Sequence, residues 1–109
     1  MSLRPLRRLM DMSAALDRDR LSFLGRRLAP GFALRVLVLG PGARRAYDPD
    51  EWRGAIVVVE SGGVVVEPVA GDSYRFGPGD VLWLQGLALR ALHNPGREPA
   101  VLAAVVRRR

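Results

Sequence analysis

The sequence contains no cysteine, which excludes disulfide bonds, thiolate metal sites and cysteine nucleophiles. Histidine is almost as scarce. The only one, His93, lies next to a turn, with no nucleophile or acid evident beside it. We therefore interpret His93 as a turn residue bonded to backbone or water, and not as a catalytic base.

Long apolar segments are also missing. No run approaches the ~18 residues that a membrane helix needs, and no apolar stretch follows the basic start of the chain, as a signal peptide would require. We therefore expect a cytoplasmic protein without membrane contact. The 109 residues suffice for one domain, and an apolar content of 49% is typical of a globular chain.

Lysine is absent as well, so arginine supplies all 17 basic residues and a formal net charge of +6. Residues 1–27 hold seven arginines and three aspartates, and residues 107–109 are all arginine. Residues 28–106 hold seven arginines and eight acidic residues, so the excess charge is at the ends. Arginine-rich ends can bind phosphate backbones. No aromatic or helix-turn-helix pattern accompanies them, so we interpret them as solvated and expect no nucleic-acid partner.

Helical periodicity occurs only near the start. Leu16, Leu21, Leu24 and Leu28 are spaced five, three and four residues apart, as on one face of a helix. We expect residues 1–31 to form an N-terminal arm that is a short helix or irregular.

The rest of the chain consists of short apolar segments separated by turns that contain glycine and proline. Many short strands with such turns are typical of a sandwich or barrel. Gly62-Gly63, between two valine runs, predicts a tight hairpin. We predict strands at 32–39, 55–60, 64–69, 73–76, 81–84, 87–93 and 100–106.

Three of these predicted strands lack the alternation of a strand with one face in water. Residues 55–59, 64–66 and 100–106 are apolar on both faces. The second face needs a cover, because otherwise it would promote aggregation. Either the N-terminal arm or a second copy of the chain could provide it, and we predict a homodimer.

In the strand-rich part of the chain, four residues have the spacing of two known sequence motifs. Gly42 and Gly62 match the ends of G-x5-H-x-H-x4-E-x6-G, and Gly79 and Asn94 match the ends of G-x5-P-x-G-x2-H-x3-N. These are the two motifs of the cupin superfamily, which residues 32–106 therefore resemble. The resemblance implies an all-β fold with a single jelly-roll β-barrel over 32–106. The arm would precede the barrel, and a basic tail at 107–109 would follow it.

In typical cupins, three histidines and a glutamate of these motifs bind a divalent metal inside the barrel. Here those four positions hold Asp48, Asp50, Ala55 and Arg90. Arginine cannot deprotonate to become a ligand, and its charge repels a cation. Two aspartates alone do not supply the converging donors that a catalytic metal needs. We therefore expect no cofactor and no metal site.

The arginine at a ligand position suggests a different use of the interior. If the cupin frame holds, Arg90 points into the barrel, where its charge requires an anion. Asp48 and Asp50 occupy the facing motif positions. We predict an internal ion pair, which is either a permanent strut or a clamp that opens to a carboxylate or phosphate ligand. Trp83 and Tyr74 are candidate walls of this ligand site.

These observations leave three functional interpretations. The first is a metal-free small-molecule-binding or accessory cupin of unknown ligand. The second is an atypical cupin enzyme, either an isomerase or hydrolase or one whose metal site is rebuilt from Asp48 and Asp50. The third is an interaction protein that uses its arginine-rich ends. We favour the first, although the fold alone does not decide among them.

Overall fold

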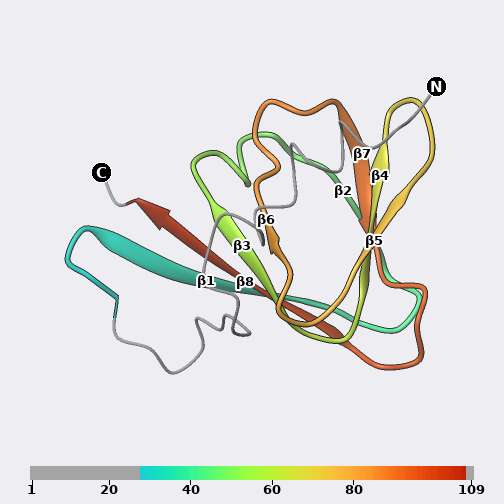
Figure 1. Ribbon diagram of the computed structural model, residues 1–109, viewed down its shortest axis with the longest axis horizontal. Coiled ribbons are helices and arrows are strands. Elements are labelled where there is room, and N and C mark those ends of the chain that lie inside the picture. The colour runs from blue at the N-terminus through green and yellow to red at the C-terminus, as the bar shows by residue number, and fades with distance from the viewer. Residues whose placement is uncertain (1–27, 108–109) are drawn as a thin grey trace.

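The computed structural model describes residues 28–107, which form eight β-strands and no helix (Figure 1). The helix predicted for the N-terminal arm lies outside the described residues. In the part of the chain described, no helix is long and apolar enough to cross a membrane. The strands are β1 (Phe32–Leu39), β2 (Arg44–Ala46), β3 (Ile56–Ser61), β4 (Val64–Pro68), β5 (Tyr74–Phe76), β6 (Val81–Leu82), β7 (Leu89–His93) and β8 (Ala100–Arg107).

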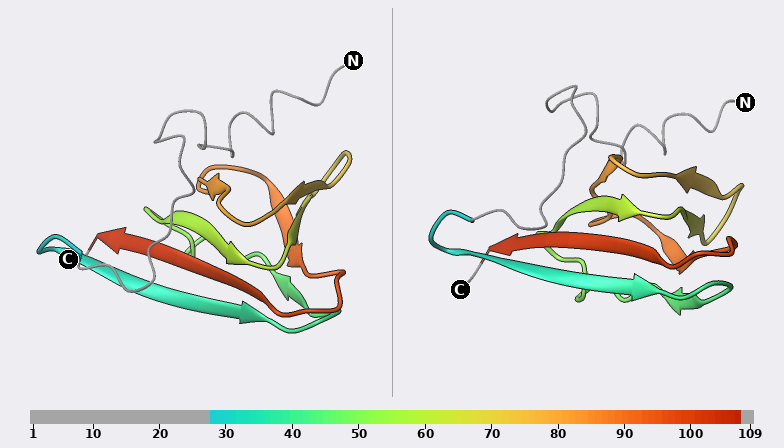
Figure 2. Two further views of the ribbon diagram at one scale, coloured as in Figure 1. Left: turned by 60° about the horizontal axis from the view of Figure 1, so that its bottom comes forward. Right: turned by 90° about the horizontal axis from the view of Figure 1, so that it is seen from below.

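The strands form two antiparallel four-stranded sheets, which lie one over the other (Figure 2). The first sheet has the order β1-β8-β3-β6, and the second has the order β2-β7-β4-β5. Successive strands therefore alternate between the sheets, except at β4 and β5, which are neighbours in the second sheet. Eight strands wound between two sheets in this way make a jelly roll, as the sequence predicts.

The structure corrects three details of this prediction. Among the described strands, no hydrogen-bonded ladder joins the two sheets, so the jelly roll is a sandwich and not a closed barrel. The hairpin predicted at Gly62-Gly63 is wrong, because β3 and β4 lie in different sheets and the turn carries the chain from one to the other. The sequence pattern also misses β2, since the three residues of this edge strand show no apolar alternation.

The apolar core lies between the two sheets. Val57 and Val59 of β3 and Val64 and Val66 of β4 are fully buried there. The core also contains Leu39, Trp52, Ala55, Phe76, Leu82, Leu84, Leu89, Leu92, Ala100, Leu102 and Ala104. The interior of the jelly roll is thus filled by apolar side chains, packed as protein interiors generally are.

Gly62 makes the crossing from β3 to β4 possible. Its φ of +72° lies in the left-handed region that favours glycine. A Cβ at this position would also lie 2.5 Å from the carbonyl oxygen of Pro99 and 2.8 Å from the Cα of Ala100. Both neighbours are backbone atoms next to the start of β8. Any side chain at position 62 would therefore have to push β8 away from the turn.

Replacing Gly62 tests this close approach. Gly62→Ala should lower the free energy of unfolding by about 3 kcal/mol or more, from backbone strain and steric overlap together. Gly42→Ala is the matched control, because Gly42 has a φ of +76° and a Cβ at that position would meet nothing within 4 Å. The control should lose only about 1–2 kcal/mol. Urea unfolding measures both, and equal losses would contradict the steric explanation.

Candidate functional site

The Asn94 side chain joins two loops at one end of the sandwich. It is 1% exposed. Its Nδ2 donates to the carbonyl oxygens of Leu39 at 2.9 Å, Gly40 at 3.2 Å and Glu98 at 2.7 Å. Its Oδ1 accepts a hydrogen bond from the Gly96 N–H at 2.9 Å. One amide thus holds the β1–β2 turn against the β7–β8 loop.

The other motif anchors (Gly42, Gly62 and Gly79, which with Asn94 end the two motifs) also shape turns. The Gly42 N–H donates to the Asn94 carbonyl at 2.8 Å, and the Gly79 N–H donates to the Val59 carbonyl at 2.8 Å. All three glycines have positive φ. The anchors that the sequence shares with cupins are therefore residues that fix the backbone.

The four cupin ligand positions show no comparable arrangement. Asp48 and Asp50 lie in the exposed loop after β2, where Asp48 Oδ1 accepts a hydrogen bond from the Asp50 N–H at 3.0 Å. Asp50 forms an ion pair with Arg53 at 2.5 Å. Ala55 is completely buried and offers no side-chain donor. Arg90 is exposed.

Arg90 donates from Nη2 to the carbonyl oxygen of Val69 at 3.2 Å. The pairing register between β4 and β7 shifts at Arg90, which has no partner on β4. Such a bulge interrupts the alternation of a strand, so Arg90 does not share the buried face of Leu92, two residues later. Within residues 28–107, no hydrogen bond or ion pair joins Arg90 to Asp48 or Asp50, so this structure does not form the predicted internal ion pair.

The two aromatic candidates lie in different parts of the fold. Tyr74 belongs to β5 in the second sheet, and its half-buried side chain packs against the core. Trp83 follows β6 of the first sheet and is also half-buried. In the described part of the chain, apolar core side chains lie between the two sheets.

A divalent metal does not fit the residues at the cupin positions. An alanine and an outward-facing arginine replace two of the four donors, and the two aspartates are exposed. In the described part of the chain, no three side chains of His, Asp or Glu lie close enough together to hold a metal ion. His93 is half-buried on β7, where its Cα partners are Arg44 and Val65.

A charged cluster, which the sequence pattern does not predict, connects the edges of the two sheets. We call Arg35, Arg45, Glu51 and Trp52 the Glu51 cluster. Arg45 of β2 binds both carboxylate oxygens of Glu51, with its Nε 3.0 Å from Oε1. Arg35 of β1 donates to the Glu51 carbonyl oxygen, and its guanidinium lies 5.5 Å from the centre of the Trp52 ring. The loop that carries Glu51 is thus tied to both sheets.

The hydrogen bonds from Arg45 hold the pKa of Glu51 below its usual range, against the opposing effect of burial. The same contact raises the pKa of Arg45. Because the folded-state pKa of Glu51 is depressed, this carboxylate contributes stability above its unfolded-state pKa. That contribution is lost as the pH falls through the folded-state pKa.

Acid unfolding of a Glu51→Gln variant tests this contribution. The variant should be less stable than the wild type near neutral pH, and the difference should shrink as the pH falls toward about 3. Asp50→Asn is the control, because the Asp50–Arg53 pair is largely exposed and should contribute little. The measurement is the free energy of unfolding by urea across the pH range. A difference between Glu51→Gln and wild type that stays constant with pH would contradict the prediction.

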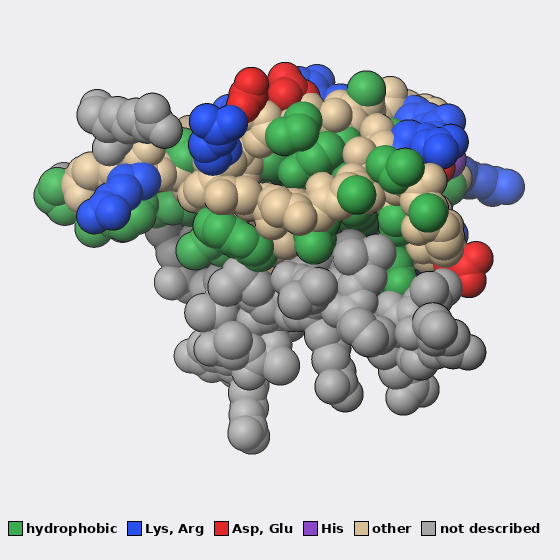
Figure 3. All heavy atoms as spheres, turned by 90° about the horizontal axis from the view of Figure 1, so that it is seen from above, with side chains coloured by type: hydrophobic (Ala, Val, Ile, Leu, Met, Phe, Trp, Pro, Cys, Tyr) green, Lys and Arg blue, Asp and Glu red, His purple; other side chains and the backbone are tan. Residues whose placement is uncertain are grey.

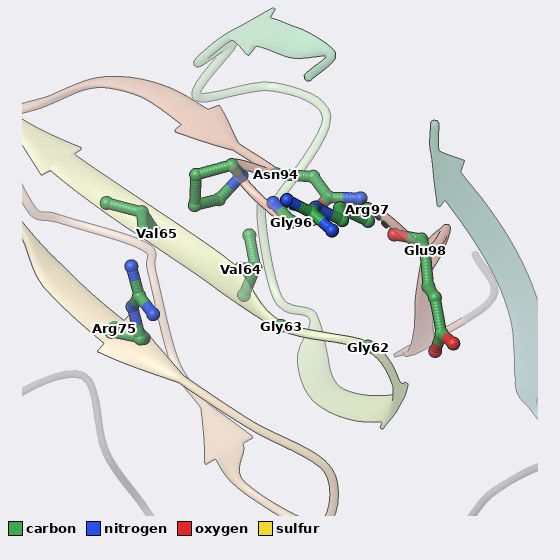
Figure 4. Close-up of a pocket in the computed structure, with 10 residues that line it drawn as sticks. Gly62, Gly63, Val64, Val65, Arg75, Asn94, Gly96, Arg97 and Glu98 are labelled. Carbon is green, nitrogen blue, oxygen red and sulfur yellow. Dashed lines mark hydrogen bonds between the residues drawn. The ribbon is translucent and has the colours of Figure 1, made fainter. Parts of the chain in front are cut away.

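A cavity of about 280 Å³ opens beside Asn94, between the β3–β4 turn and the β7–β8 loop (Figure 4). We call it the Arg75–Arg97 cavity. Arg75 of β5 and Arg97 of the loop contribute guanidinium groups, and apolar wall comes from Val64 and Val65. Its other lining residues are Gly62, Gly63, Asn94, Pro95, Gly96 and Glu98.

The charges of the Arg75–Arg97 cavity are mainly positive. Among the described residues, none forms a hydrogen bond or ion pair with Arg97. The Glu98 carboxylate points away from the Arg97 guanidinium, while the Glu98 carbonyl oxygen accepts the hydrogen bond from Asn94 (Figure 4). Sequence reasoning misses this site because it depends on which strands are neighbours. The available signal is Arg97 directly after the Asn94-Pro95-Gly96 turn.

No protein-family model matches the sequence, and no curated protein matches it significantly. Among solved structures, the chain is similar to the Cupin_2 domain of an XRE family transcriptional regulator from Enterobacter cloacae, whose crystal structure has a resolution of 1.9 Å. The TM-score is 0.55 and the sequence identity is 25%, over 72% of this chain and 83% of that one.

The strand order and the spacing of the motif anchors define a small jelly-roll protein, and the structural likeness points to the same class. The chain belongs to the cupin superfamily.

Proposed function

We propose that the chain is a metal-free accessory cupin that binds a small anionic molecule in the Arg75–Arg97 cavity. One observation carries the proposal. The cupin residues that fix the turns are present, whereas those that would bind a metal are absent or exposed. The fold is thus retained without the side chains that would bind a metal. Binding a small molecule does not require those side chains.

The lining of the cavity supports an anionic ligand. A guanidinium presents a planar fork of donors that holds a carboxylate or phosphate group through two hydrogen bonds. Arg97 has its donors available among the described residues, and Arg75 adds a second positive charge. The apolar surfaces of Val64 and Val65 would contact a nonpolar portion of the ligand. A volume of about 280 Å³ is near the lower end of ligand pockets and suits a small organic acid or phosphate ester.

The comparison supports an accessory role. The similar structure is a cupin domain that belongs to a transcriptional regulator. In such a protein, a small-molecule-binding domain would report the presence of its ligand to another part of the assembly. In the present chain the proposed ligand would likewise be read by a contacting surface, because the described residues form only the jelly roll.

Thermal shift with inorganic phosphate, citrate and benzoate tests the site. At ten times its dissociation constant, a bound probe should raise the Tm of the wild type by about 5–10 °C. Arg97→Ala should abolish the rise. Arg90→Ala removes an exposed arginine whose hydrogen-bond partner among residues 28–107 is the Val69 carbonyl, and it should preserve the rise.

The opposite result, in which Arg90→Ala abolishes the rise and Arg97→Ala does not, would place the ligand at the position predicted from sequence. Equal shifts in all three proteins would place the anions elsewhere, most simply on the arginine-rich ends. The absence of a shift in the wild type with every probe would contradict the anionic ligand.

A further inference from the structure

β1 carries most of the exposed large hydrophobic side chains of the described chain. Four of the five exposed large hydrophobic side chains belong to this strand: Phe32 (41% exposed), Leu34 (37%), Val36 (48%) and Val38 (58%). They alternate along β1 and therefore lie on one face of the first sheet. In the view of Figure 3, hydrophobic side chains are exposed on the surface of the molecule, and basic side chains lie between them.

This surface is not a general property of the first sheet. On the neighbouring strands of the same sheet, Val58 of β3 and Ala103 of β8 have no exposed surface, although Ala103 is the Cα partner of Val36. The apolar face is thus covered over β3 and β8 and uncovered over β1. The sequence predicts apolar residues on both faces of several strands. In the described structure, the exposed large hydrophobic residues of this sheet all lie on β1.

β1 is also an edge strand, and none of the other described strands pairs with its outer side. Among the described strands it pairs only with β8 (Figure 2), in register over all eight residues and without a bulge. Eight residues of extended strand span about 26 Å. Natural edge strands are usually protected by prolines, bulges or charges. β1 has no proline, and its one charged residue, Arg35, is held by Glu51 and Trp52. A long, apolar, unprotected edge is a surface that accepts another strand.

We propose that two copies of this chain pair through β1, antiparallel, to form one continuous sheet across a homodimer. A second copy is the occupant that fits the observed edge best. An antiparallel pair of identical strands is related by a two-fold axis, so the assembly closes at two copies. The other edge of the same sheet is β6, which has only two residues and offers β1 too short a ladder.

The side chains also select a register for this pairing. With the two-fold axis at Val36, this residue faces Val36 of the partner subunit, and Leu34 faces Val38 of the partner subunit. The exposed apolar residues then pack side by side across the strand pair. In the same register Arg35 faces Leu37 of the partner subunit. Centring the axis on Arg35 would instead place two arginines opposite each other, which is unfavourable.

Cross-linking tests both the interface and its register. The chain has no cysteine, so Val36→Cys introduces a single thiol. Directly opposed residues of antiparallel strands have the Cα separation that a disulfide requires. Under mild oxidation Val36→Cys should become a covalent dimer. Val69→Cys is the matched control, since Val69 is a similarly exposed valine (54%) in the loop after β4, and it should stay uncross-linked.

Light scattering after gel filtration gives an independent readout. The wild type and Val69→Lys should be dimers at tens of micromolar, whereas Val36→Lys should raise the dimer dissociation constant at least about tenfold, because it opposes two charges. Circular dichroism checks that the variants are folded. A monomeric wild type would overturn the proposal and leave residues 1–27 of the same chain as the cover of this edge. An unchanged dimer dissociation constant in folded Val36→Lys, or cross-linking no better than in Val69→Cys, would assign the dimer to another surface.

Discussion

The buried amide of Asn94 is the interaction on which the rest of the structure depends. It contacts three carbonyl groups and one N–H group from two loops, and these loops end β1, β7 and β8. Each such backbone group, buried without a partner, would cost about 1–3 kcal/mol. No aliphatic residue could replace the amide, and a carboxylate would turn acceptors toward the carbonyl oxygens. The position of this one side chain therefore fixes the end of the jelly roll.

The same end of the molecule holds the proposed binding site. Asn94 lines the Arg75–Arg97 cavity, and Gly62, whose turn approaches β8 closely, lines it as well. The residues that hold the loops thus also set the shape of the cavity. The Glu51 cluster performs a similar task elsewhere, because it ties the loop after β2 to both sheets. The Asn94 side chain and the Glu51 cluster thus both fix loops through polar contacts, whereas the core between the sheets is apolar.

The positions of the two cupin motifs fall into two groups in this chain: the motif anchors, which are retained, and the metal-ligand positions, which are not. The motif anchors determine backbone conformation and are retained, so the fold is retained. The ligand positions carry Asp48, Asp50, Ala55 and Arg90, and the interior is packed with apolar side chains. Burial of such side chains stabilises a fold without any metal. A scaffold of this kind can lose its metal chemistry and still offer its loops for binding.

The sequence predicts the fold well because the motif anchors have strict backbone requirements. Gly62 needs positive φ and Asn94 needs its amide, so their spacing identifies the jelly roll. The sequence does not reveal which strands pair, and a tight turn at Gly62-Gly63 suits a hairpin as well as a crossing between sheets. Nor does it reveal the bulge that turns Arg90 outward. The candidate site brings together Arg75 and Arg97, which are neighbours only once the strand order is known.

We propose that packing and hydrogen bonds hold this cupin together without a metal. The most direct test measures metal content by mass spectrometry and thermal unfolding before and after treatment with a chelator. We predict no stoichiometric transition metal and the same Tm in both samples. About one metal ion per chain, with a fall in Tm on chelation that Asp48→Ala reproduces, would contradict it.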